Sequence, residues 1–160
     1  MNKGILQYLI FFILSSGVVN DIKAQPAAEK VKAEIREVLN IWNETAKKAD
    51  VDRCLSLFDD GDDVILAGSD IGEICRGKAQ IRKWLSAIFA HANFSWDMKT
   101  IDIDYNGKTA WVFVEGAMIV QWDNGQTVKT PYRFTGIIVR KNKVWKWRLF
   151  NGSIPRGEKS

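Results

Sequence analysis

Histidine, cysteine and proline are scarce in this 160-residue sequence, which contains one, two and three of them, respectively. With 12 glycines and 46% hydrophobic residues, the chain is not collagen-like, of low complexity or intrinsically disordered. Its length suits a single domain. The formal net charge of +4 arises from 23 basic and 19 acidic residues mixed along the chain. This distribution predicts no nucleic-acid partner, because nucleic-acid-binding domains concentrate their basic residues on one face.

The single histidine limits the catalytic and metal sites that the chain can build. A Ser-His-Asp or Cys-His site needs a histidine as its base. We expect His91 at the end of a helix, where a cation offsets the helix dipole. One histidine and two dispersed cysteines provide no recognisable set of zinc ligands, and no glycine-rich phosphate loop is present. We therefore predict no metal and no cofactor.

Two charged stretches resemble binding sites only in composition. Four aspartates within residues 59–63 suggest a calcium loop, but the glycine is misplaced for an EF-hand and no glutamate closes the loop. We interpret this stretch as a solvated acidic loop. Basic residues gather within residues 140–148, which we interpret as a solvated sheet edge that lysines protect from aggregation.

The long apolar run of the sequence lies at the N-terminus. Residues 5–19 form this run after a basic start, and it is shorter than the roughly 20 residues of a spanning helix. The layout is typical of a secretory signal peptide that ends at Ala24. We predict a signal peptide over residues 1–24 and a mature domain over 25–160, secreted or periplasmic and free of the membrane after cleavage. A retained N-terminal anchor is the alternative.

The two cysteines, Cys54 and Cys75, remain in the predicted mature chain. Export would expose them to an oxidising compartment, where they could form a disulfide. We favour two separately buried thiols, because free cysteine is often buried.

Hydrophobic periodicity divides the chain into helices followed by strands. Helical spacing predicts helices over residues 26–49, 51–58 and 78–91, with Pro26 at the first helix start and two short strands over residues 64–68 and 73–76. From Phe94 onward the period changes to two, with Asn-Gly turns at residues 106–107 and 124–125 and a bulge between residues 99 and 101. The pattern predicts four long antiparallel strands in an α+β fold, with the helices on one face of the sheet.

Three short motifs resemble those of one protein family. Residues 145–155, WKWRLFNGSIP, resemble the final strand of SnoaL-like proteins, and residues 132–136, YRFTG, resemble the strand before it. Residues 68–73, GSDIGE, resemble the turn ahead of the third helix. The order of the elements over residues 31–155 is similar to the nuclear transport factor 2-like fold. Where the family often has histidine in the last strand, this chain has Asn151.

The resemblance implies a cone fold, or cystatin-like roll, in which a curved antiparallel sheet wraps around three N-terminal helices and leaves a conical pocket. We expect the helices to line this pocket with Trp42, Phe58 and Trp84, and Glu73 to lie near its mouth. From the sheet we expect Arg133, Thr135, Trp147 and Asn151. A three-residue loop over residues 141–143 would place Arg133 opposite Asn151. A two-residue loop would change this register, and the sequence leaves the choice open.

Family members include isomerases, polyketide cyclases, dehydratases and non-catalytic binders, so the fold alone implies no reaction. We predict an exported protein that binds a small apolar or amphipathic ligand. One alternative is an isomerase, cyclase or dehydratase with Glu115 or Asp70 as base and Tyr132, Trp84 or Asn151 as hydrogen-bond donor. Another is a non-catalytic interaction domain. Apolar residues on both faces of the long strands predict a homodimer through the outer face of the sheet.

Overall fold

A computed structural model of the protein describes residues 19–157. Most of the predicted signal peptide, residues 1–18, lies outside the described residues. The chain divides into two units, residues 1–33 and 34–160, and the description below concerns the second unit. The helices are α1 (Val19–Lys47), α2 (Val51–Ser56) and α3 (Gly77–Phe89), and the strands are β1 (Ile65–Ala67), β2 (Ile74–Arg76), β3 (Ala92–Asn106), β4 (Thr109–Trp122), β5 (Thr127–Lys141) and β6 (Val144–Ser153).

The start of the first helix is the one boundary that differs by several residues from the prediction. The helix α1 begins at Val19, so Pro26 lies inside the helix and does not begin it. A proline removes one backbone donor, and helical residues on both sides of it can continue the helix at that cost. Within residues 19–157, no helix combines the length and apolar character that crossing a membrane requires.

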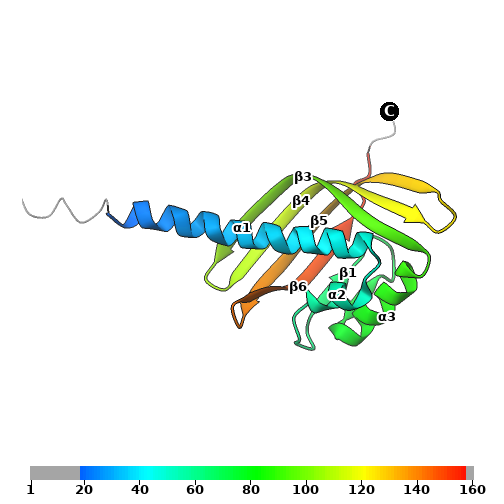
Figure 1. Ribbon diagram of the computed structural model, residues 1–160, viewed down its shortest axis with the longest axis horizontal. Coiled ribbons are helices and arrows are strands. Elements are labelled where there is room, and N and C mark those ends of the chain that lie inside the picture. Colours follow the sequence, from blue (N-terminus) through cyan, green and yellow to red (C-terminus); the bar gives the residue numbers. More distant parts are fainter. Residues whose placement is uncertain (1–18, 158–160) are drawn as a thin grey trace, which may run out of the picture. The chain divides into compact units, whose positions relative to one another are not determined.

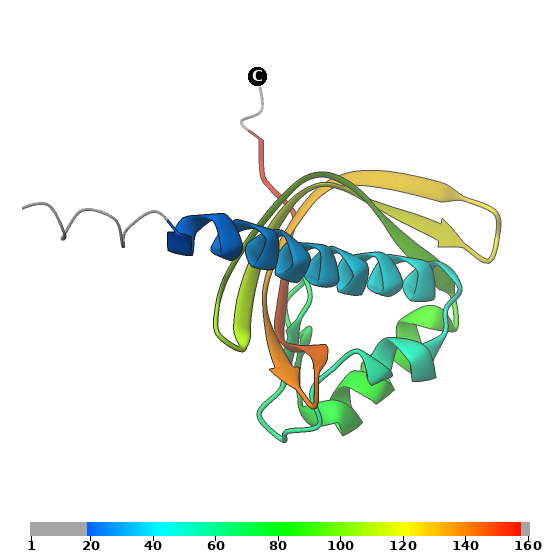
Figure 2. The same cartoon turned by 60° about the vertical axis from the view of Figure 1, so that its left-hand side comes forward.

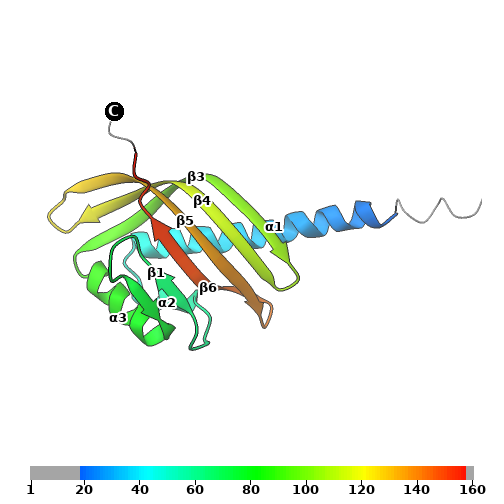
Figure 3. The same ribbon diagram turned by 180° about the vertical axis from the view of Figure 1, so that it is seen from behind.

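The six strands form one sheet in the order β2-β1-β6-β5-β4-β3. All neighbours pair antiparallel except β1 and β6, which are parallel. The long strands curve around the part of α1 that belongs to the second unit, and α2 and α3 lie on the same side (Figures 1 and 2). This is the predicted α+β cone fold. Seen from behind, the outer face of β3 to β6 is not covered by any described helix (Figure 3).

The bulge predicted in the first long strand is present. The pairing of β3 with β4 shifts between Met98 and Thr100, which moves the inward-facing set from even to odd positions. Phe94, Trp96 and Met98 therefore share the inner face with Ile101 and the residues that follow it in alternation.

The last hairpin differs from the predicted register. Its turn has two residues, Asn142 and Lys143, with φ angles of 50° and 67°, as a type I′ turn requires. A second irregularity follows, because Ile138 pairs with Trp147 whereas Ile137 pairs with Leu149. Arg148 is thus an extra residue in β6. Of the two loop lengths that the sequence left open, the two-residue loop is present, and the bulge places Asn151 opposite Thr135, whereas the three-residue loop would have placed it opposite Arg133.

The side chain of Arg148 gives a physical reason for this bulge. Its guanidinium binds Asp59 at 2.9 Å and also pairs with Asp63. Both aspartates belong to the loop between α2 and β1. The Asp59 backbone N–H donates to the carbonyl of Trp147 at 2.8 Å, which fixes the loop beside the bulged strand.

The acidic loop is solvated at Asp60, Asp62 and Asp63, as the sequence predicted, but not at its first aspartate. Asp59 is fully buried, and it accepts a second hydrogen bond from Lys141 at 2.8 Å. Burial alone would raise the pKa of Asp59, but the hydrogen bonds from Lys141 and Arg148 hold it below its usual value. Hydrogen bonds from Lys78 and Lys146 lower the pKa of Asp60 to about 2. Three basic residues of the last hairpin, Lys141, Lys146 and Arg148, thus bind this loop.

An aromatic cluster forms the centre of the core. Phe58 and Trp147 are fully buried, and Phe134 and Phe150 stack with ring centroids 5.2 Å apart. The ring of Trp147 lies against Gly136, where a Cβ atom would overlap it. Phe58 and Trp147 thus fill the space between helices and sheet at this end of the fold.

The two cysteines are buried and unpaired, as the favoured interpretation held. The Cys54 thiol donates to the hydroxyl of Thr45 at 3.1 Å. Burial raises the pKa of Cys54 to about 11, so this thiol stays protonated and unreactive at neutral pH.

Candidate functional site

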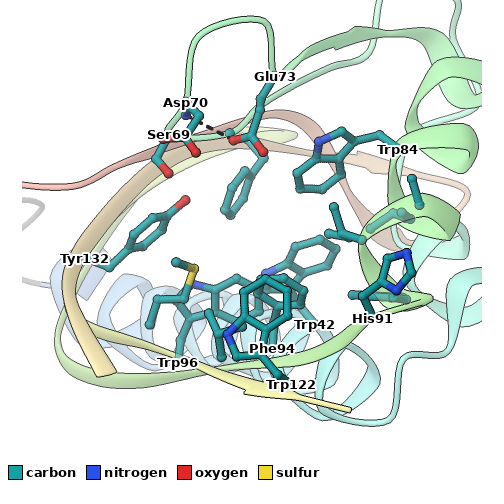
Figure 4. Close-up of a pocket in the computed structure, with 18 residues that line it drawn as sticks. Trp42, Ser69, Asp70, Glu73, Trp84, His91, Phe94, Trp96, Trp122 and Tyr132 are labelled. Carbon is teal, nitrogen blue, oxygen red and sulfur yellow. Dashed lines mark hydrogen bonds between the residues drawn. The ribbon is translucent and has the colours of Figure 1, made fainter. Parts of the chain in front are cut away.

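A cavity of about 440 Å³ opens between α3, the C-terminal part of α1 and the inner face of the sheet. Its walls are mostly aromatic and aliphatic (Figure 4). Trp42 comes from α1 and Trp84 from α3, while Trp96 comes from β3 and Trp122 from the end of β4. The volume lies within the range of about 300–1,000 Å³ typical of small-molecule sites.

Two hydrogen bonds between the Asn43 side chain and the Trp96 backbone fix the positions of two of these tryptophans. The Asn43 side chain accepts from the backbone N–H of Trp96 at 2.7 Å and donates to its carbonyl at 3.2 Å. This pair fixes α1 to β3, and the rings of Trp42 and Trp96 stack at 5.5 Å as a result. The indole N–H groups of both residues are buried and have no hydrogen-bond partner among the described residues.

Three of the predicted pocket residues, Trp42, Glu73 and Trp84, line this cavity. Phe58 and Trp147 do not line it, because they are fully buried in the aromatic core. Whether any of these residues contacts a ligand remains a prediction.

Arg133, Thr135 and Asn151 lie on the opposite face of the sheet. The bulge at Arg148 reverses the alternation in β6, so Phe150 and Gly152 are buried on the inner face and Asn151 is exposed on the outer one. Arg133 donates to the Ser153 hydroxyl at 3.3 Å. The prediction that Arg133, Thr135 and Asn151 face the conical pocket was therefore wrong, because it assumed an unbroken alternation along β6.

Polar groups of the cavity gather at one end, where the turn between β1 and β2 meets β5. Ser69, Asp70 and Glu73 come from the turn and Tyr132 from the strand (Figure 4). The backbone N–H of Asp70 donates to the Glu73 carboxylate at 3.0 Å. Gly68 leaves room for this carboxylate, since a Cβ atom there would overlap it.

Tyr132 is buried, and its hydroxyl points into the polar end of the cavity (Figure 4). A Cβ atom on Gly152 would overlap this hydroxyl, so glycine on the neighbouring strand makes its position possible. Burial, followed by the charge of Glu73, raises the pKa of Tyr132 to about 12, although a hydrogen bond with Ser69 opposes the increase. The phenol therefore stays protonated at neutral pH and can donate a hydrogen bond.

His91 follows the C-terminus of α3, at the helix end where the sequence placed it. Its carbonyl accepts from the backbone N–H of Asp123 at 3.0 Å. Its side chain also lines the cavity, which the sequence analysis did not foresee. Among residues 19–157, no group of three or more His, Cys, Asp or Glu side chains is placed to hold a metal ion.

The candidate base Glu115 is not part of the cavity. It is exposed on the outer face of β4, opposite Arg133. Asp70, the other candidate, lines the cavity, as do the candidate donors Tyr132 and Trp84. The cavity thus contains two carboxylates and one neutral phenol at the same end.

Comparison with known proteins identifies the family. The model of the SnoaL-like domain matches residues 35–157, and the chain belongs to the SnoaL-like family. No curated protein sequence matches the chain.

Several solved structures share the fold. A nuclear transport factor 2-like superfamily protein from Salmonella enterica is 21% identical, with 81% of this chain and 94% of that one covered at a TM-score of 0.72. A proposed dehydratase of the same superfamily from Streptomyces avermitilis is 15% identical, with 81% and 99% covered at a TM-score of 0.69. A protein with a cystatin-like fold from Novosphingobium aromaticivorans is also 15% identical, with 90% and 94% covered at a TM-score of 0.69. At these identities the likeness concerns the fold alone.

Proposed function

We propose that the protein binds a small amphipathic molecule in the cavity between α3 and the sheet. The observation that carries this proposal is the separation of apolar and polar groups within about 440 Å³. Tryptophan and phenylalanine rings provide an apolar wall, while Ser69, Asp70, Glu73 and Tyr132 gather at one end. A ligand with an apolar body and one polar end fits such a cavity in a single orientation.

Ligand binding is tested by filling the cavity from α3. Ala87 lines the cavity, whereas Ala79 lies on the same helix outside it. We expect Ala87→Trp to abolish the binding of apolar metabolites captured by the purified protein and identified by mass spectrometry. Ala79→Trp, the matched control, is expected to leave their binding intact. Equal capture by both variants would contradict the proposal.

An enzyme of the isomerase or dehydratase type is the second candidate, and one observation favours it. The protonated Tyr132 phenol lies at the same end of the cavity as the Asp70 and Glu73 carboxylates. A carboxylate can remove a proton from a carbon next to a carbonyl while a neutral phenol stabilises the developing oxyanion. Turnover of a carbonyl compound that Tyr132→Phe slows at unchanged KM would support this candidate.

We also propose that the outer face of the sheet binds a second copy of the chain. Trp111 and Ile137 are 46% and 38% exposed on this face, beside a hollow of about 480 Å³. Aspartates 102 and 104 lie on β3 and Arg133 lies on β5, so a twofold arrangement can pair opposite charges across the interface.

Export is a proposal that depends on the sequence of residues 1–24. N-terminal sequencing of the protein isolated from its cells is expected to give a mature chain that starts at Gln25. A chain that retains Met1 would contradict cleavage.

A further inference from the structure

Apart from the imidazole of His91 and the phenol of Tyr132, the ionisable side chains that line the cavity are carboxylates. Asp70 and Glu73 contribute to the lining, and neither lysine nor arginine is among the lining residues of the described chain. The ion pairs formed within residues 19–157 use other acidic groups, including Asp59 and Asp60, and leave Asp70 and Glu73 without a cationic partner. The polar end of the cavity therefore has an uncompensated negative charge.

The Glu73 carboxylate is held in this position by the backbone. It is half-buried, and it accepts the Asp70 N–H at 3.0 Å within the tight turn between β1 and β2. The Glu73 N–H donates to the Asp70 carbonyl at 3.2 Å, and its own carbonyl accepts from Gly68 at 2.8 Å. Because these bonds use the turn backbone, the carboxylate is positioned before any ligand arrives.

Aromatic rings flank this negative end. Figure 4 shows the ring of Trp84 on one side of Glu73 and that of Tyr132 on the other, while His91 lies across the cavity from Tyr132. The face of an aromatic ring attracts a cation, most strongly in tryptophan. Carboxylates and ring faces at the same end favour a positively charged group and disfavour an anion.

We propose that the ligand of this cavity is a monovalent organic cation, an ammonium or amidinium group on an apolar body. The inference rests on the proposed binding function and names the chemical class of its ligand. The cationic group lies between Glu73 and the rings of Trp84 and Tyr132, and the apolar body lies against Trp42 and Trp96. The phenol of Tyr132 accepts a hydrogen bond from the ammonium through its oxygen, since a protonated hydroxyl keeps its acceptor lone pairs.

Three probes with a common naphthalene body test the sign of the charge. They are 2-(1-naphthyl)ethylamine, which is cationic at neutral pH, the neutral 2-(1-naphthyl)ethanol and the anionic 1-naphthylacetate. Calorimetric titration at physiological salt is expected to give an affinity about tenfold higher for the amine than for the alcohol, with the anion weakest. Equal affinities for the amine and the alcohol would overturn the cation inference and leave the proposed function standing. If none of the three binds, both are overturned.

Substitution of Glu73 tests the origin of the preference. Glu73→Gln keeps an oxygen for the Asp70 N–H but removes the charge. We expect it to reduce the preference for the amine to about twofold while the affinity for the alcohol is unchanged. Asp62→Asn, which removes an exposed carboxylate outside the cavity, is the matched control and should keep the full preference. Asp70→Asn provides a second variant if Glu73→Gln folds poorly, and a full preference retained in both would overturn the inference.

Discussion

Side chains of the long strands point alternately to the inner and the outer face of the sheet, and the two faces differ in what covers them. The inner face contacts helices α1 and α3, buries Phe134 and Ile138, and contains the cavity. The outer face leaves Trp111 and Ile137 partly exposed and contains the charged residues Glu115 and Arg133. Composition does not distinguish the two faces, because both include tryptophan and β-branched residues. Strand register alone assigns each residue to a face.

A matched pair of tryptophan truncations tests this difference most strongly. Trp147→Ala removes a fully buried ring of the inner face, and we expect a loss of about 4 kcal/mol in the free energy of unfolding. Trp111→Ala removes a ring that is 46% exposed, and at concentrations below dimer formation it should cost less than about 1 kcal/mol. Urea unfolding of both variants measures the two values. Similar losses would show that the outer face is as buried as the inner one.

The bulge in β6 is bound to Asp59 through Arg148. Asp59→Asn removes the charge that binds Lys141 and Arg148, and we expect the free energy of unfolding to fall by about 2–3 kcal/mol at neutral pH. This loss is smaller than for a fully buried ion pair, because both cations are partly exposed. The folded-state pKa of Asp59 is lowered, so its stabilisation is complete above the unfolded-state value of about 3.9 and is lost as the pH falls below it. Acid unfolding between about pH 5 and 2 should therefore be shallower in the variant. An unchanged acid profile would contradict this role of Asp59.

The proposed dimer uses only the outer face. Ile137→Asp places a charge in that face, and we expect the dimer dissociation constant to rise at least about tenfold. Ile71→Asp, at a fully exposed loop tip, is the matched control and should leave the dimer intact. Multi-angle light scattering over a concentration series measures both. A monomeric mass for the unsubstituted chain at micromolar concentration would refute the dimer.

The smallest expected effect concerns a single hydroxyl on the inner face. Burial raises the pKa of Tyr132 to about 12, so the folded state favours the protonated phenol. This stabilisation is complete below the unfolded-state value of about 10 and is lost as the pH rises towards the folded-state value. Tyr132→Phe should therefore reduce the loss of stability between about pH 10 and 12, as thermal unfolding at several pH values would measure. The same loss in both proteins would show that the phenol ionises freely in the folded state.

Local sequence patterns predicted the regular parts of the sheet. The strand over Thr109–Trp122 was expected with its observed bounds, because alternating residues and Asn-Gly turns define both of its ends. The bulge in β3 was expected from a change of parity in the apolar set. These features depend on neighbours in the sequence, which a pattern can detect.

The last hairpin depends on contacts that no local pattern contains. Its turn requires positive φ at Asn142 and Lys143, and neither is glycine. The bulge at Arg148 is held by Asp59, which lies 89 residues earlier in the chain. Arg133, Thr135 and Asn151 were expected at the cavity from an unbroken alternation along β6, which this distant contact interrupts. The expectation for Trp42, Glu73 and Trp84 did not depend on that register. The even-numbered residues Phe94 and Trp96 could have been added from their predicted alternation.

Arg148 adds one residue to β6, and the bulge accommodates it without interrupting the pairing of β6 with β5. Removal of Arg148 would bring Trp147 directly before Leu149, restore unbroken alternation and leave every residue from Leu149 to Ser153 on its present face. Phe150 would stay in the aromatic core, and Asn151 would stay on the outer face. In evolutionary terms, a one-codon deletion at this position would leave the lining of the cavity unchanged but would remove the guanidinium that binds Asp59 and Asp63.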